Sequence, residues 1–400
     1  MRRFMIILLA FAAAARADTI EERLQRLEDQ VAALKTENAQ LRRDLGLEVL
    51  ARQPDVRAAS SSSESVQLGG MLQAQAETGD RGDSRYTTPN SRIFLRRARL
   101  SVGGRFVQDF TFRTELEVAG SVNDTSGFRA QLTDAYINWG RFDFANVRVG
   151  QFKTPFGFEQ LYLDQRLYFI ERSLVNDRLT LNRQIGIAVG GAFLDERLNY
   201  AIGLFNGNGT NLNFNDNDRF LNVGRMSAVP FVGRFRSNVS RWSVGANGFR
   251  TRDSSVTLPA EFLVDSTPAT AARDNIFAGR RSGFGIDSQF ELGRLELWFE
   301  SLRGTFEPDD RLPARHFTSR GAYQQASYFV IADKLQFVAR HETFRPLASL
   351  SAAQTRTNIF GVNYYIKQHD LKLQLDYTRG RVPDLPGEQT KILARLQTVF

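Results

Sequence analysis

The feature that most constrains the fold of this 400-residue chain is an alternation of apolar and polar residues that returns many times after residue 65. In segment 371–377, three leucines and a tyrosine alternate with Lys372, Gln374 and Asp376, and the same period ends the chain in 391–400. Successive side chains of a β-strand point to opposite faces of the sheet, so this period predicts strands with one apolar and one polar face. We count about 16 such segments of roughly 10 to 12 residues, the length of a tilted strand that crosses a bilayer.

The connections between these segments alternate in length. Short turns are expected near 106–108, 141–143, 195–196, 237–240, 292–294, 332–334 and 367–370. Longer loops are expected at 78–90, 119–127, 154–182, 207–219, 252–280, 306–320, 344–356 and 381–388. Outer-membrane barrels have short periplasmic turns and longer extracellular loops. The pattern therefore predicts an all-β fold, a 16-stranded antiparallel transmembrane β-barrel over residues 66–400, with 154–182 as its third extracellular loop.

A soluble β-sandwich is the alternative fold, because its strands alternate in the same way. An open sheet pair rarely reaches about 16 strands without curling or closing, and aromatic residues gather near the segment ends, as in the girdles of membrane barrels. The last residue, Phe400, lies in register with the apolar face of the final segment. A mean hydropathy of −0.33 argues against a bundle of membrane helices, each of which needs about 20 consecutive apolar residues.

The N-terminus predicts a processing signal. Arg2 and Arg3 precede an apolar stretch at 4–15, which ends in the small-x-small sequence 15–17. This order is typical of a secretory signal peptide, and the stretch is too short to span a membrane. We predict a signal peptide at 1–17 and a mature chain that functions outside the cytoplasm.

A heptad pattern follows the signal. Apolar residues from Ile20 to Leu45 are separated by alternating gaps of four and three, with Asn38 as the one polar position of the seam. This pattern predicts a coiled-coil oligomerisation segment at 18–50, in the periplasm. A single amphipathic helix lying on a protein surface is the alternative. The Ser-rich segment 51–65 is predicted to be a flexible linker between the coil and the barrel.

Composition narrows the function. The absence of cysteine excludes disulfides and thiol catalysis, and three widely separated histidines argue against a dedicated metal site, so no metal or cofactor is predicted. Of the 52 basic residues 46 are arginine, and the charges of 1–17 and 18–50 cancel, so the net charge of +8 belongs to 66–400. Arginine offers planar donors that suit phosphate and carboxylate. The secretory signal argues against nucleic acid as the partner.

Several motifs resemble those of a known family. They are Arg-Arg-Ala-Arg-Leu-Ser-Val-Gly-Gly at 96–104, Asp-Ala-Tyr-Ile at 134–137, Val-Arg-Val-Gly-Gln-Phe-Lys-Thr-Pro-Phe-Gly at 147–157, Glu171-Arg172, and Leu-Phe-Asn-Gly at 204–207. Their order and spacing resemble the phosphate-selective porin O and P family of Gram-negative outer membranes. The resemblance implies a trimeric 16-stranded channel that favours anions, with arginines along its lumen and an inward-folded third loop. Phe400 resembles the terminal residue that the barrel assembly machinery reads.

Cations with inward parity or in the third loop form the predicted anion pathway: Arg97, Arg99, Arg113, Lys153, Arg166, Arg172, Arg178 and Arg183. The acids expected to position these arginines are Asp164, Glu171 and Asp177. Two alternatives stay open: the loop is a surface loop with internally compensated charges, or the strand arginines are wall residues neutralised by neighbouring acids. In the second predicted strand, the alternation places Phe94 and Arg96 on the lipid-facing side of the barrel. A position near the rim of the barrel would accommodate the charge of Arg96.

We therefore predict an outer-membrane porin, not an enzyme, which forms a water-filled, anion-selective channel for passive uptake of phosphate or related small anions. Its predicted partners are its own copies in a homotrimer, small anions, outer-membrane lipid and the barrel assembly machinery. A general-diffusion porin with weak anion preference is the main alternative. An outer-membrane barrel enzyme is a further alternative, for which the adjacent His341 and Glu342 would be the candidate base and acid.

Overall fold

The computed structural model describes residues 65–86, 91–107, 109–120, 127–235, 238–262, 276–309, 316–348, 354–383 and 385–400. The predicted signal peptide, coiled coil and all but the last residue of the predicted linker lie outside these ranges. In the described part of the chain, no helix is long and apolar enough to cross a membrane.

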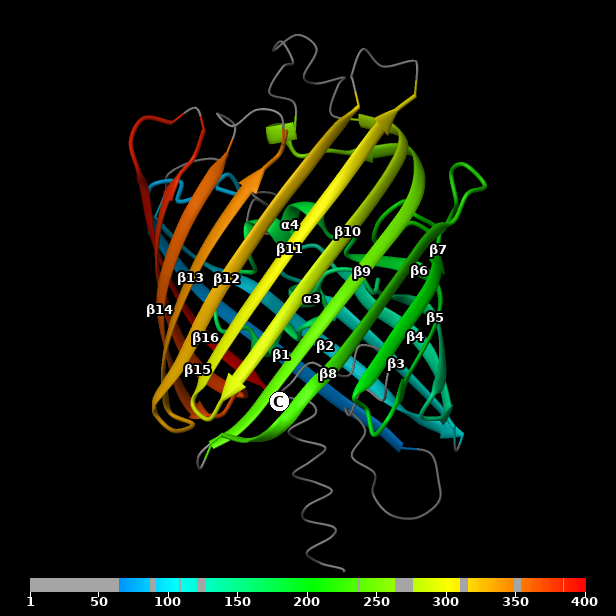
Figure 1. Cartoon of the computed structure of the whole chain (residues 1–400), viewed down its shortest axis with the longest axis horizontal. Helices are drawn as coiled ribbons and strands as arrows, with labels where there is room; N and C mark the ends of the chain where they lie inside the picture. Colours follow the sequence, from blue (N-terminus) through cyan, green and yellow to red (C-terminus); the bar gives the residue numbers. More distant parts are fainter. Residues whose placement is uncertain are drawn as a thin grey trace, which may run out of the picture. The chain divides into compact units, whose positions relative to one another are not determined.

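Sixteen antiparallel strands form a closed barrel within the described residues, and this confirms the predicted all-β fold (Figure 1). Each strand pairs with its neighbours in sequence, and β16 closes the ring on β1. The first eight strands are β1 (Ser65–Gly79), β2 (Arg92–Val107), β3 (Phe110–Glu117), β4 (Gln131–Phe142), β5 (Ala145–Lys153), β6 (Arg183–Phe193), β7 (Leu198–Phe205) and β8 (Leu221–Phe235). The others are β9 (Asn238–Thr257), β10 (Ile276–Leu292), β11 (Leu295–Pro308), β12 (Phe317–Ile331), β13 (Leu335–Arg345), β14 (Thr355–Lys367), β15 (Leu371–Arg381) and β16 (Gln389–Val399).

The wall of the barrel has a polar inner face and an apolar outer face. In β15 the side chains of Lys372, Gln374 and Asp376 point into the barrel and are buried. Between them, Leu373 and Leu375 are 45% and 50% exposed on the outer surface. The period-two pattern of the sequence thus becomes an outer surface suited to lipid and a polar interior.

One predicted loop is shorter than the sequence suggested. The expected loop 252–280 is reduced at both ends, because β9 continues to Thr257 and β10 begins at Ile276. The ladder between them includes the pair Val256 and Phe277. Phe277 packs edge-on against Phe306 inside the barrel, with ring centroids 5.5 Å apart, and this contact stabilises the extension.

The prediction that Arg96 faces outward is wrong, because β2 contains a β-bulge at this residue. Gln73 of β1 pairs with Arg97 and the next residue of β1 pairs with Leu95, so Arg96 has no partner in the ladder. An extra residue in one strand breaks the alternation of faces. The guanidinium of Arg96 consequently lies inside the barrel, where it bonds to Glu171.

The same bulge corrects a second residue. Beyond Arg96 the parity of β2 is reversed, and Phe94 pairs with Gln75, whose side chain is buried in the barrel interior. Residues directly opposite each other in an antiparallel pair point to the same face. Phe94 is therefore an inward residue and not a lipid-facing one.

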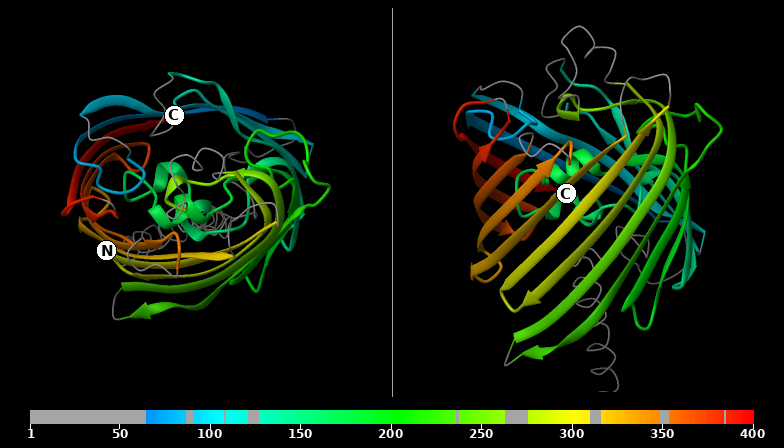
Figure 2. Two further views of the ribbon diagram at one scale, coloured as in Figure 1. Left: turned by 90° about the horizontal axis from the view of Figure 1, so that it is seen from above. Right: turned by 45° about the horizontal axis from the view of Figure 1, so that its top comes forward.

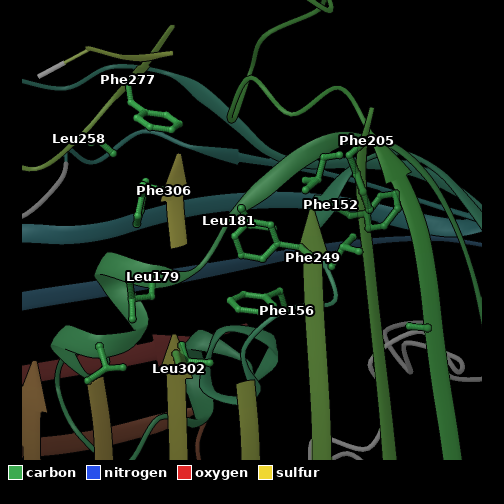
Figure 3. Packing of buried hydrophobic residues seen from close by; sticks show 14 of the residues in the cluster. Phe152, Phe156, Leu179, Leu181, Phe205, Phe249, Leu258, Phe277, Leu302 and Phe306 are labelled. Carbon is green, nitrogen blue, oxygen red and sulfur yellow. The ribbon is translucent and has the colours of Figure 1, made fainter. Parts of the chain in front are cut away.

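The third loop folds into the barrel and fills part of its interior. It contains α3 (Phe158–Leu161), the 3₁₀ turn η1 (Asp164–Arg166) and α4 (Leu174–Leu179), which lie within the ring of strands (Figure 2). Its Phe156 and Leu179 belong to a cluster with wall residues such as Phe249 and Phe306 (Figure 3). Another 3₁₀ turn, η2 (Ala260–Phe262), adds Phe262 to this cluster from the loop between β9 and β10. The apolar residues of the loop thus pack against many strands of the wall.

Candidate functional site

Three carboxylates of the wall hold the backbone of the third loop. Glu300 on β11 accepts the N–H of Phe158 at 2.5 Å, Glu342 on β13 that of Leu174 at 3.1 Å, and Asp376 on β15 that of Ile170 at 2.7 Å. Buried N–H groups without partners are costly. The wall therefore satisfies donors that an irregular loop could not pair within itself.

Wall side chains also donate to the carbonyls of the loop. Lys372 bonds to the carbonyl of Leu167 at 2.8 Å, and Gln397 to that of Gln165 at 2.9 Å. Arg340 on β13 is 3% exposed and donates to the carbonyl of Glu171 at 3.1 Å. The loop is thus fixed along much of its length on β11 to β16.

The first loop also folds inward and supports the third. Arg85 donates to the carbonyl of Arg172 at 2.5 Å, and Asp83 pairs with Arg85 at 2.6 Å. Tyr86 packs with Ile170 of the third loop. Asp83 is only 1% exposed, so the Arg-Gly-Asp tripeptide that ends at this residue is not presented as an adhesion motif would be.

Asp164 is the centre of the charged part of the loop. Its carboxylate lies 2.5 Å from Arg172 of the same loop and 2.6 Å from Arg99 of β2. Arg97, also on β2, lies 3.7 Å from it and donates to Gln73 at 2.8 Å. One acid of η1 therefore joins three cations, two of which come from β2 of the wall.

These cations keep Asp164 ionised. Burial alone would raise the pKa of Asp164, but the guanidiniums around it, that of Arg172 above all, hold the pKa well below its ordinary value. The pKa of Glu171 is also lowered, because Arg96 and Arg395 outweigh the effect of burial. Both loop carboxylates are thus negative at physiological pH and compensate part of the surrounding positive charge.

Further pairs extend this network along β2 to β6. Arg99 bonds to Glu117 at 2.7 Å and lies 3.3 Å from Glu115, which in turn pairs with Arg113 at 2.7 Å. At the base of the loop, Arg183 bonds to Asp134 at 2.8 Å. We call these connected charges around Asp164 the Asp164 network.

Lys153 is the least compensated member of the Asp164 network. It lies opposite Arg183 in the ladder of β5 and β6 and donates to the carbonyl of Tyr162 at 3.0 Å. Among the described residues, no carboxylate lies within ion-pair distance of its Nζ. Two like charges thus face each other where the loop leaves the wall.

Of the remaining predicted loop residues, Asp177 and Arg178 pair with each other. Arg178 in α4 bonds to Glu261 of η2 and to Asp177 at 2.6 Å, and the side chain of Asp177 is 47% exposed. Arg166 belongs to η1, two residues after Asp164. The structure therefore brings together six of the eight predicted cations and separates Arg178 from them.

Sequence reasoning missed several interior arginines. Arg395 of β16 bonds to Glu171 at 2.7 Å and to the carbonyl of Ile170, and Arg340 bonds to Glu159 of the third loop at 2.7 Å. The alternation of apolar and polar residues in β13 and β16 predicts that both side chains point into the barrel. Nothing local in the sequence indicated that their partners lie in a loop about 170 to 225 residues away.

The Asp164 network adjoins a hollow of about 210 Å³ in the barrel interior. Its polar lining includes Arg99, Ser101, Arg113, Glu115 and Gln165. The cations of the network and of the adjoining Glu171 pairs are Arg96, Arg97, Arg99, Arg113, Lys153, Arg172, Arg183 and Arg395. Their carboxylates are Glu115, Glu117, Asp134, Asp164 and Glu171. Eight cations against five carboxylates leave an excess of three positive charges in this set, of which Arg99, Arg113 and Glu115 line the hollow.

A closed 16-stranded barrel with an apolar outer face, a polar interior and an inward-folded third loop defines a porin of the Gram-negative outer membrane. The model of the family described as phosphate-selective porin O and P matches residues 66–229 of this chain. The family resemblance expected from the motifs is thereby confirmed. Porins of this family are channels, in agreement with the prediction that the protein is not an enzyme.

Individual relatives are distant. Porin O of Pseudomonas aeruginosa is 19% identical over 304 residues, which cover 70% of this chain and 67% of that protein. Among solved structures, an anion-selective porin from Comamonas acidovorans matches with a TM-score of 0.59 at 13% identity, over 84% of this chain and all of that one. The trimer form of OmpT from Vibrio cholerae matches with a TM-score of 0.61 at 12% identity, over 85% of this chain and all of that one. These two structures support the fold.

Proposed function

We propose that this porin is an anion-selective channel for phosphate or related small anions, and that the Asp164 network is its selectivity element. The observation that carries the proposal is the excess of three cations in the Asp164 network and the adjoining Glu171 pairs, of which Arg99 and Arg113 line the interior hollow. The family is described as phosphate-selective and the similar porin of Comamonas acidovorans as anion-selective, so both point to the same class of substrate.

The geometry suggests how selection and release combine. Guanidinium groups replace part of an anion's hydration with directed donors. Because carboxylates such as Asp164 and Glu115 share those donors, each contact with a passing anion stays weak enough for the anion to leave. In this mechanism Arg97, Arg99, Arg113, Lys153 and Arg172 meet the anion, while Asp164 and Glu171 hold the arginines in place.

The first test is the reversal potential of the mature protein in planar bilayers under a KCl gradient. We expect chloride to be more permeant than potassium, and phosphate to reduce the chloride current by competition. Lys153→Gln is expected to lower the chloride-to-potassium permeability ratio about fivefold, since a charge about 4 Å from an ion contributes at least about 1 kcal/mol. Arg141→Gln is the matched control, because this exposed arginine lies at the far end of β4.

Other results would point elsewhere. A wild-type ratio near one would favour the general-diffusion porin, and cation preference would contradict the proposal outright. An unchanged ratio in both Lys153→Gln and Arg113→Gln would place the filter outside the Asp164 network.

A homotrimer joined by a periplasmic coiled coil at 18–50 is part of this proposal. The similar OmpT structure is described as a trimer, and the heptads of 18–50 suit association with copies of the same chain. Since 18–50 lies outside the described residues, the coiled coil stays a prediction from the sequence.

We also propose that Phe400 is the assembly signal. Its backbone exchanges hydrogen bonds of 2.8 and 3.0 Å with Gly70 of β1, and a Cβ added at Gly70 would lie 2.4 Å from the ring of Phe400. Gly70→Leu, like deletion of Phe400, is therefore expected to reduce assembled barrel in outer membranes several-fold. The measurement is the heat-modifiable gel mobility of membrane fractions. Leu68→Ala, an outward change two residues away, is the control, and normal assembly of both altered proteins would contradict the assignment.

A further inference from the structure

A band of arginines faces outward from the barrel on the strands that lead to the long loops. Nine arginines of β9 to β15, the wall at the front of Figure 1, point away from the lumen at the loop ends of these strands. They are Arg250, Arg252, Arg280, Arg303, Arg320, Arg345, Arg356, Arg379 and Arg381. We call this set the outer arginine band. No arginine takes an outward position at the same end of the described strands β1 to β7, so the band belongs to one side of the barrel.

Members of the outer arginine band lie directly opposite one another in the ladder. Arg320 of β12 pairs with Arg303 of β11 on one side and with Arg345 of β13 on the other. Two further pairs join Arg252 with Arg280, and Arg356 with Arg381. Like charges directly opposite each other destabilise a sheet. The band therefore favours the binding of an anion that neutralises opposed arginines on adjacent strands.

The described residues supply few acids for this purpose, one of which is Glu307, opposite Arg280 in the ladder of β10 and β11. Arg252 pairs with Asp309 at 2.7 Å, and Arg379 pairs with Glu388. Arg345 and Arg356 share only the neutral Gln354, at 2.9 and 3.3 Å. Arg303 and Arg320 have no ion pair or side-chain hydrogen bond within the part of the chain that the structure describes.

The band begins where the apolar outer surface ends. The last outward aromatic residue lies four positions before Arg303 on β11, at Phe299, and two positions before Arg379 on β15, at Tyr377. The outer surface contains an apolar groove of about 530 Å³ on β11 to β15, which borders the band at Tyr377 of β15 and extends on β11 to β13 toward the short turns. Ala326, Ala339, Tyr328, Phe337, Phe360 and Tyr377 are among the residues that line it. Aromatic and apolar residues meet the acyl region of a bilayer, so the arginines reach the level of the head groups.

We propose that the outer arginine band binds the phosphate groups of a phosphorylated glycolipid of the outer leaflet, with an acyl chain of this lipid along the groove of β11 to β15. The planar donors of arginine bind phosphate bidentately, and one phosphate between opposed arginines neutralises a pair that the protein leaves uncompensated. The outward direction of the side chains separates this site from the Asp164 network, which faces the lumen. It is therefore independent of the proposed channel selectivity.

The test is lipid binding by the full-length protein in detergent, with bisphosphorylated lipid A titrated in native mass spectrometry. The variant replaces Arg303, Arg320 and Arg345 by glutamine. Since each arginine near an anionic membrane surface contributes roughly a factor of five, the triple variant is expected to bind lipid A about 100-fold more weakly. The matched control replaces Arg141, Arg234 and Arg294 by glutamine, which removes the same charge from exposed positions at the short-turn end. This control is expected to bind as the wild type does.

Further measurements separate binding of the phosphate groups from other causes of a change in affinity. Dephosphorylated lipid A is expected to bind the wild type and the triple variant equally weakly, and the reversal potential of the triple variant is expected to be unchanged. If the triple variant fails to assemble, Arg320→Gln alone is expected to lose about fivefold in affinity. Equal affinity of wild type and variants for bisphosphorylated lipid A would overturn the proposal. So would a loss of oligomer mass in the triple variant with unchanged lipid binding, because the face would then be an interface between copies of the chain.

Discussion

Asp164→Asn is expected to increase the preference of the channel for anions and to lower the stability of the constriction. The substitution removes the carboxylate shared by Arg97, Arg99 and Arg172, so one buried and two partly buried guanidiniums lose their common partner. Breaking a buried ion pair from one side costs about 3–5 kcal/mol. We expect a lower unfolding temperature of the purified barrel and a reversal potential shifted further toward that of chloride.

Asp177→Asn is the matched control for this experiment. Asp177 lies in the same loop, pairs with Arg178 alone within the described part of the chain, and is half exposed. Its loss is expected to change stability by less than about 1 kcal/mol, as for other exposed pairs. If Asp164→Asn left both the unfolding temperature and the selectivity unchanged, the Asp164 network would not organise the constriction.

The second large effect is expected for Arg340→Met, which should release the third loop from the wall. Arg340 bonds to Glu159 at 2.7 Å and to the carbonyl of Glu171 at 3.1 Å, and its guanidinium lies 4.1 Å from the ring centre of Phe169. Methionine keeps the apolar contact but leaves the fully buried Glu159 without its cation, at a cost of about 3–5 kcal/mol. We expect a larger and noisier single-channel conductance, because the loop then occupies the lumen less firmly.

Arg345→Met tests whether this effect belongs to the lumen. Arg345 is five residues further along the same strand and faces outward, so its loss is expected to leave the conductance unchanged. Additional removal of the buried charge in Arg340→Met/Glu159→Gln is expected to restore part of the stability. A conductance trace identical to that of the wild type in Arg340→Met would show that the other wall contacts hold the loop without it.

The strands could be predicted from the sequence because their apolar and polar side chains alternate with a period of two residues. In β15, for example, each inward polar residue follows an outward apolar one, and the barrel environment follows from that order alone. The inward direction of the Arg96 side chain could not be predicted in this way. A bulge inserts one extra residue into the strand, and the alternation of apolar and polar residues does not reveal where it lies. The period fails at the place where the structure brings an extra cation to Glu171.

The candidate site was predicted in part for a similar reason. The motif at 96–104 and the acids of the third loop indicated that arginines and carboxylates would gather there. Which acid meets which arginine depends on how the loop crosses the lumen, and Arg340 and Arg395 join it from strands far along the chain. Such pairings are set by the closed barrel and not by any local sequence.

The anchoring of the third loop on β11 to β16 has a consequence for the order of folding. Glu342, Asp376 and Arg395 enter the barrel from the last third of the chain, so the loop cannot dock until those strands are in place. Arg395 lies on β16, the strand that closes the ring on β1. The step that seals the wall thus also completes the narrow passage, and a cell is not exposed to a sealed but wide pore during assembly.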